Sequence, residues 1–121
     1  MHVSRERFEE LVADALDTIP PDLAARMENV VVLVEDWPTP EQVGGRHGTL
    51  LGLYEGVQLT QRSPMSYAGV MPDRITIFRG PLSTLSRDEA DLAHRIRVTV
   101  VHEVAHHFGI DDARLRELGW A

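Results

Sequence analysis

The sequence predicts a single α+β domain in which an N-terminal helix and a long C-terminal helix pack on a small mixed β-sheet. Three observations support this fold class. Apolar residues recur at intervals of three and four near the N-terminus, and again over the last third of the chain, which is helical periodicity. Short aliphatic or alternating runs lie between these two segments. Glycine and proline separate the runs, as is typical of strands joined by turns.

The length and composition indicate one globular domain. The chain has 121 residues, of which 43% are hydrophobic and 26% are charged, and a chain of this size supports one hydrophobic core. We therefore expect residues 1–121 to form a single domain. The net charge is -7, from 12 basic and 19 acidic residues. Because nucleic-acid binding requires a basic surface, no nucleic-acid partner is expected.

The absence of cysteine and the character of the N-terminus limit the chemistry and the compartment. Without cysteine, disulfides, thiolate metal ligands and a cysteine nucleophile are excluded. The segment from Met1 to Arg7 is charged, and no long apolar run follows it. We therefore expect neither a signal peptide nor a membrane span, and the default location is the cytoplasm.

The first helix is predicted to begin after Ser4 and to end before Pro20. Ser4 is a suitable N-cap because its hydroxyl can accept a hydrogen bond from a free backbone N–H of the first turn. The residues that form the apolar stripe are Phe8, Leu11, Val12, Ala15, Leu16 and Ile19. After the prolines, residues 22–28 are expected to form one or two further helical turns.

The strands are predicted between the helices. Residues 30–34 are five consecutive valines and leucines, a run that suits a strand covered on both faces. Residues 50–53 form the second strand, and Gly56 marks a turn or bulge after which residues 57–60 extend the pairing. Residues 74–79 alternate between polar and apolar, which is the pattern of a half-buried strand.

The long helix is predicted to begin at Ser86 and to run to Phe108. Ser86 and Glu89 have the spacing of a capping box, in which each side chain satisfies a backbone donor of the other residue. Apolar residues cover much of the circumference, so we expect the helix to be packed between the sheet and other elements. Two histidines and a glutamate are costly to bury on such a helix unless they are hydrogen-bonded or metal-bound, which favours a functional site.

That candidate site lies at the end of the helix. His102 and His106 are one turn apart on the same face, so both imidazoles can reach one ion. Glu103 lies about 100° around the helix, near enough to reach a water on that ion. Gly109 is a helix stop, because glycine enters the left-handed C′ conformation without steric cost, and the turn can bring Asp112 back as a third ligand. Two imidazoles and one carboxylate suit Zn²⁺ and leave a fourth position open for water, as in catalytic zinc sites.

The order His-Glu-x-x-His-x-x-Gly-x-x-Asp in residues 102–112 resembles the signature of the zincin metallopeptidases, in the branch whose third ligand is aspartate. The whole chain is also similar to the bacterial mini-zincins, which are single-domain proteins. Residues 51–56 and 72–79 carry the additional matches. The resemblance therefore covers most of the chain, and only the zinc motif within it is specific for chemistry.

The resemblance implies a zincin-like minimal domain with one zinc ion per chain and a peptide or protein substrate. In that family Glu103 would act as the general base that activates water for peptide-bond hydrolysis. The resemblance also implies that the strand at residues 74–79 is an edge strand beside the metal. An extended peptide could join such a strand through its unpaired backbone groups.

Two other functions stay open on the sequence. A non-catalytic peptide- or protein-binding module could use the same scaffold with zinc absent or structural, although structural zinc sites normally have four protein ligands. Hydrolysis of a non-peptide amide would use the same metal chemistry. Few residues follow Asp112, and the methionine turn of larger zincins is absent. Trp120 or a second subunit is therefore the candidate floor of the site, and a homodimer is a hypothesis.

Four further residues are candidates for minor roles. Tyr67 is a candidate donor to a developing oxyanion, and His47 is a candidate loop ligand. His107 is out of register with the two motif histidines, and we predict a structural role for it. Asp111 is predicted to cap the last helix, at residues 113–118.

Overall fold

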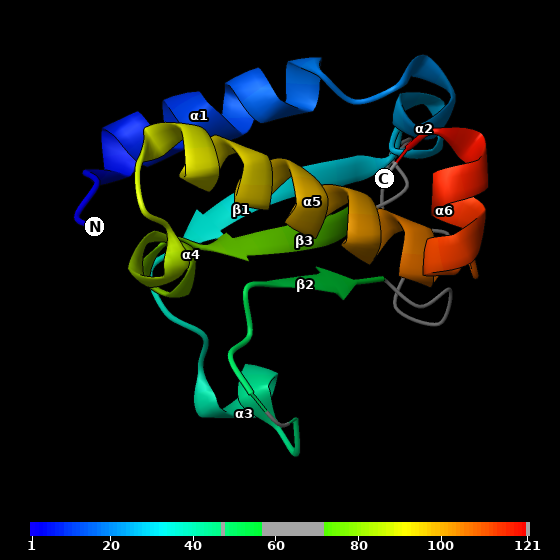
Figure 1. Ribbon diagram of the computed structural model, residues 1–121. Helices are drawn as coiled ribbons and strands as arrows, with labels where there is room; N and C mark the ends of the chain where they lie inside the picture. Colours follow the sequence, from blue (N-terminus) through cyan, green and yellow to red (C-terminus); the bar gives the residue numbers. More distant parts are fainter. Residues whose placement is uncertain (47, 57–71, 121) are drawn as a thin grey trace.

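The computed structural model describes residues 1–46, 48–56 and 72–120, which form a helical layer packed on a small sheet (Figure 1). The elements of this part of the chain are α1 (Arg5–Asp17), α2 (Pro21–Arg26), β1 (Val30–Glu35), α3 (Pro40–Val43), β2 (Gly52–Glu55), β3 (Asp73–Phe78), α4 (Arg79–Leu85), α5 (Glu89–His107) and α6 (Asp112–Leu118). The strand order is β1-β3-β2, with β1 parallel and β2 antiparallel to β3. The predicted α+β class with a mixed sheet is confirmed.

The hydrophobic core lies between the sheet and the pair of helices α1 and α5, which run side by side over one face of it (Figure 1). The fully buried side chains of this core include Phe8, Ile75, Ile77, Leu92, Ile96, Val100 and Val104. The apolar stripes of α1 and α5 therefore meet Ile75 and Ile77 of β3. The prediction that this strand is half-buried is wrong, because Thr76 and Phe78, which alternate with these residues, are buried as well. In the described ranges, no helix combines the length and the apolar character needed to cross a membrane.

The N-terminal helix forms as predicted. The Ser4 hydroxyl accepts a hydrogen bond from the backbone N–H of Arg7, at 3.2 Å, which satisfies one of the free donors of the first turn. The helix ends at Asp17, before Pro20, and the buried residues on its stripe are Phe8, Leu11, Val12 and Ala15. The short helix α2 begins at Pro21, where the missing N–H of proline costs nothing.

The prediction that residues 30–34 are covered on both faces is wrong. Val30, Val32 and Val34 pack against the core, whereas the side chains between them point the other way. Val31 is 39% exposed and Leu33 is 41% exposed. The physical reason is that α1 and α5 both lie on one face of the sheet, so an uninterrupted aliphatic run is buried only at alternate positions.

The prediction that residues 74–79 form an edge strand is also wrong. The strand that forms there, β3, is the central one, because β1 pairs with one side of it and β2 with the other. Its backbone groups are therefore used in two ladders and are not available to a peptide. The second strand is displaced by two residues from its predicted start and covers Gly52–Glu55. The predicted extension at residues 57–60 lies outside the described residues.

The start of the long helix differs from the prediction as well. The N-cap of α5 is Asp88, whose carboxylate accepts from the backbone N–H of Asp91 at 2.8 Å. Ser86 instead ends α4, and its hydroxyl donates to the carbonyl of Leu82 at 2.7 Å. The expected capping box between Ser86 and Glu89 does not form, because the unpredicted helix α4 uses the serine at its own C-terminus.

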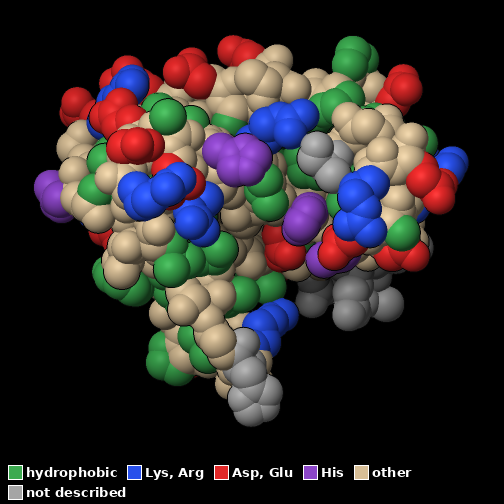
Figure 2. All heavy atoms as spheres, in the orientation of Figure 1, with side chains coloured by type: hydrophobic (Ala, Val, Ile, Leu, Met, Phe, Trp, Pro, Cys, Tyr) green, Lys and Arg blue, Asp and Glu red, His purple; other side chains and the backbone are tan. Residues whose placement is uncertain are grey.

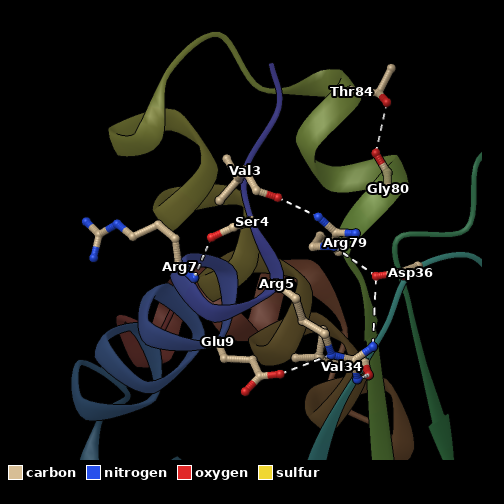
Figure 3. Close-up of polar contacts among 10 residues, drawn as sticks. All are labelled: Val3, Ser4, Arg5, Arg7, Glu9, Val34, Asp36, Arg79, Gly80 and Thr84. Atoms are coloured by element: carbon tan, nitrogen blue, oxygen red, sulfur yellow. Dashed lines mark hydrogen bonds and ion pairs between the residues drawn. The ribbon is translucent and has the colours of Figure 1, made fainter.

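A polar network joins the N-terminus, the end of β1 and the start of α4 (Figure 3). One carboxylate oxygen of Asp36 accepts a hydrogen bond from Arg79 Nε at 2.8 Å and lies 3.9 Å from a guanidinium nitrogen of Arg5. Arg79 also donates to the carbonyl of Val3, and Arg5 donates to the carbonyl of Val34. The hydrogen bond from Arg79 holds the pKa of Asp36 below its ordinary value of 3.8.

This network predicts a pH-dependent stability difference between the wild-type protein and Asp36→Asn. A carboxyl whose pKa is lower in the folded state stabilises the fold above its unfolded pKa, and that contribution is lost as the pH falls through the folded pKa. The wild type should therefore be more stable than the variant at pH 7, and the difference should shrink below pH 3.8. Urea unfolding of both proteins between pH 7 and about pH 2.5 measures it, with Asp14→Asn on the exposed face of α1 as the charge-matched control. A difference that does not change with pH would contradict the account.

Candidate metal centre

The two motif histidines lie together at the C-terminal end of α5. The ring centroids of His102 and His106 are 5.8 Å apart, with an angle of 33° between the ring planes. Their side chains are 38% and 56% exposed. Figure 2 shows histidine and acidic side chains adjoining at the surface over this end of α5. The one-turn spacing therefore brings the two imidazoles to one accessible place, as predicted.

The helix ends in a glycine turn that directs the chain back toward these histidines. Gly109 has a φ of 74°. The backbone N–H of Ile110 donates to the carbonyl of Ala105 at 2.8 Å, and the backbone N–H of Gly109 donates to the backbone carbonyl of His106 at 3.1 Å. This pair of bonds is the Schellman arrangement, which satisfies two carbonyls of the last helical turn. The predicted glycine stop is confirmed.

The last helix begins directly after this turn and carries the predicted third ligand. Asp111 is the N-cap of α6, and its carboxylate accepts from the backbone N–H of Arg114 at 2.8 Å. Asp112 is the first residue of α6, one position before the predicted start of that helix. A carboxylate oxygen of Asp112 lies 4.0 Å from Nε2 of His102 and 3.7 Å from Nε2 of His106. The turn thus brings the aspartate to both imidazoles.

These three groups fit zinc by chemistry, although they are spaced more widely than bound ligands. In a tetrahedral site with bonds of about 2.0–2.1 Å, two ligand atoms are about 3.3 Å apart. The separations from Asp112 to the imidazoles exceed that value by several tenths of an ångström. Within residues 1–46, 48–56 and 72–120, no group of three or more His, Asp or Glu side chains has the geometry of an assembled metal site. Small side-chain rotations of the exposed ligands would be needed to close the set.

Glu103 differs from these three groups because it is held between α5 and the sheet. One of its carboxylate oxygens accepts a hydrogen bond from the backbone N–H of Tyr54 in β2, at 3.0 Å. Burial raises the pKa of Glu103 above the ordinary value of 4.5. The hydrogen bond from Tyr54 and the charges of His106, Arg46 and His102 act in the opposite direction and offset part of that increase.

The side chain of Tyr54 is itself fixed by residues of two other elements. Its ring stacks on the imidazole of His107 with centroids 3.9 Å apart and planes 16° apart. Its hydroxyl donates to Oδ2 of Asp73 at 2.7 Å, and this carboxylate oxygen also lies 3.8 Å from Nε2 of His107. Sequence reasoning missed Tyr54 and Asp73 as site residues. Their positions in the two segments that resemble the mini-zincins were the available signal.

Two of the remaining candidate site residues are not described, and a third belongs to the hydrophobic core. His47 and Tyr67 lie outside the described residues, as does most of the segment between β2 and β3. Trp120, the candidate floor, is 6% exposed and belongs to the hydrophobic core. The described structure therefore shows the motif residues close together and adds the contacts of Tyr54.

The comparisons with known proteins agree with this fold. The family described as zincin-like metallopeptidase matches residues 27–120, a range that includes the sheet and the helices that carry the motif. The chain belongs to the zincin-like metallopeptidase family. A solved structure of a conserved hypothetical protein from Thermus thermophilus is similar, with 25% sequence identity and a TM-score of 0.56, over 88% of this chain and 94% of that chain. Among curated proteins no match was found. The predicted family is confirmed, whereas the mini-zincin type and the aspartate ligand stay predictions.

The close approach of β2 to α5 predicts that Gly52→Ala destabilises the protein. A Cβ at Gly52 would lie 2.6 Å from the methyl group of Thr99 and 3.2 Å from the carbonyl oxygen of Thr76. The hydroxyl of Thr99 donates to the carbonyl of Arg95 at 2.7 Å, so its methyl group cannot rotate away without losing that bond. We expect a loss of about 1–3 kcal/mol in the free energy of unfolding, typical of overpacking.

Denaturant unfolding measures this loss, and Gly45→Ala is the matched control. A Cβ at Gly45 meets no heavy atom within 4 Å, so that variant should unfold at nearly the wild-type midpoint. Equal stability of the two variants would show that β2 does not need the glycine for its approach to the helix.

Proposed function

We propose that this chain is a zinc-dependent peptidase of the mini-zincin type, with His102, His106 and Asp112 as zinc ligands and Glu103 as the general base. One observation supports this more than any other. The end of α5 presents the accessible imidazoles of His102 and His106 beside the half-buried carboxylate of Glu103. A carboxylate oxygen of Asp112 lies 4.0 Å from Nε2 of His102 and 3.7 Å from Nε2 of His106. Membership of the zincin-like metallopeptidase family supports the reaction class.

The proposed chemistry divides between the metal and Glu103. Bound zinc would lower the pKa of water and polarise the scissile carbonyl. Glu103 takes the proton from the attacking water and returns it to the leaving amine. Burial raises the pKa of Glu103, which suits a group that must first accept a proton and then release it. The backbone N–H of Tyr54 holds one oxygen of the carboxylate while this happens.

The proposed substrate is a peptide, and the sheet order changes where it would bind. Because β3 is central, a peptide cannot extend the sheet there, whereas β2 has a single ladder partner among the described strands. The β2 edge beside Glu103 therefore replaces residues 74–79 as the proposed place for the peptide. Because the N–H of Tyr54 at this edge donates to Glu103, the peptide would pair with the backbone of β2 at positions other than that donor. One zinc per chain, the cytoplasmic location and the homodimer stay predictions.

Replacing the general base should separate catalysis from metal binding. In Glu103→Gln the amide keeps an oxygen that can accept from Tyr54 but cannot take up a proton. Peptide hydrolysis should therefore fall by about 10²- to 10⁴-fold, with zinc content unchanged. A peptide library digested with the zinc-loaded protein and read by mass spectrometry tests this. Full activity in the variant would refute the role of Glu103, and absence of hydrolysis by the wild type would favour the binding module.

A pair of adjacent aspartates tests the third ligand. Asp112→Asn should weaken zinc binding at least about 100-fold, because it removes an anionic ligand and the loss should be no smaller than that of an outer-shell partner. Asp111→Asn makes the same change in charge, and asparagine still caps α6, so zinc affinity should stay close to wild type. Competition with a chromophoric chelator gives both dissociation constants. Equal affinities in the two variants would remove Asp112 from the ligand set.

A further inference from the structure

We propose that Tyr54 is a positioning residue, which His107 and Asp73 hold so that the backbone N–H of β2 fixes the carboxylate of Glu103 beside the two motif histidines. This inference rests on the proposed function for its catalytic consequence. The contacts that support it belong to three separate elements, α5, β2 and β3, so it concerns the way in which the site is assembled and not the metal itself.

The backbone N–H of Tyr54 points away from the neighbouring strand β3. The carbonyl of Leu51 accepts from the N–H of Phe78 in the neighbouring segment. Tyr54 stands opposite Ile75 in the antiparallel ladder. Because backbone groups alternate along a strand, those of residues 51 and 53 face β3 and the N–H of Tyr54 faces away from it. A donor at this outer edge needs a partner, and Glu103 supplies it at 3.0 Å.

The ring of Tyr54 is held at its face and at its hydroxyl. The imidazole of His107 stacks on it at 3.9 Å, and the hydroxyl donates to Asp73 at 2.7 Å. Asp73 is the first residue of β3, and its backbone N–H donates to the carbonyl of Asn29 at 3.0 Å. The ring is therefore anchored to the helix at its face and to the central strand at its hydroxyl. A shift of β2 along α5 would break one of these contacts.

The fixed strand sets the orientation of the Glu103 carboxylate. Glu103 is joined to its backbone by rotatable bonds, so its place on α5 alone does not fix its carboxylate. The bond from Tyr54 to one oxygen selects one orientation and leaves the other oxygen free of that bond. Catalytic groups work best when neighbouring residues hold them in one geometry. His107 adjoins His106 in sequence, so the residue that fixes the strand adjoins a proposed ligand.

Amide hydrogen exchange of Tyr54 tests the contact without any need for enzymatic activity. In His107→Ala the ring loses its stacking partner, and exchange of the Tyr54 amide should accelerate about fivefold, as for the loss of one hydrogen bond. His107→Phe keeps a ring to stack on Tyr54 and should restore slow exchange. Glu103→Ala removes the acceptor and should accelerate the same amide. His94→Ala, on the exposed side of α5, is the control and should leave it unchanged.

The amide of Leu53 distinguishes positioning from general loosening, because it faces β3 and not Glu103. Positioning predicts that the Leu53 amide keeps its protection in His107→Ala. Equal acceleration of both amides would mean that the strand merely frays and would overturn the proposal. Unchanged exchange at Tyr54 in Glu103→Ala would also overturn it, since the acceptor would then have no effect.

Steady-state kinetics of the zinc-loaded variants tests the catalytic consequence. Misplacement of the base should lower kcat at least about tenfold in His107→Ala with KM and zinc content unchanged, and His107→Phe should recover most of the rate. A change in KM alone would indicate that Tyr54 contacts substrate and would overturn the positioning role. If neither the wild type nor any variant hydrolyses peptides, the proposed function fails. The exchange data still decide whether Tyr54 holds Glu103.

Discussion

The packing of β2 against α5 is the constraint on which the site depends. Gly52 allows the strand to approach Thr99 on the helix, and two residues later the N–H of Tyr54 meets the carboxylate of Glu103 at 3.0 Å. If the strand moved outward, a strand donor and a half-buried carboxylate would both lose their partner, and an unsatisfied buried group costs about 1–3 kcal/mol. The same contact therefore serves the stability of the fold and the geometry of the site.

One end of α5 offers two different environments within a few residues. Glu103 lies between helix and strand, where burial raises its pKa, whereas the side chains of His102, His106 and Asp112 are 38%, 56% and 61% exposed. Exposed side chains can change rotamer at little cost, which suits groups that must close around a cation. The half-buried carboxylate of Glu103 is held by a backbone donor, which suits a group that must keep one position. The fold thus divides the site into an adjustable part and a fixed part.

The parts of the site that were predicted from sequence depend on local geometry. The helical repeat places His102 and His106 together, and Gly109 ends the helix because the left-handed turn requires glycine. Strand order could not be predicted in this way, since a period of two shows which face is buried and not which strand is adjacent. The exposed face of β1 was missed for a different reason, because its continuous aliphatic run has no polar alternation to show which face meets solvent. Tyr54 was missed because its contact with Glu103 joins residues 49 positions apart.

The most direct test of the account is a crystal structure of the zinc-loaded protein with anomalous diffraction at the zinc edge. We expect one strong peak, within about 2.1 Å of Nε2 of both motif histidines and of a carboxylate oxygen of Asp112. Glu103 should remain outside the ligand set, and it should keep its hydrogen bond from the backbone N–H of Tyr54. A zinc ion bound elsewhere on the surface, or one that takes Glu103 as a ligand in place of Asp112, would contradict the account.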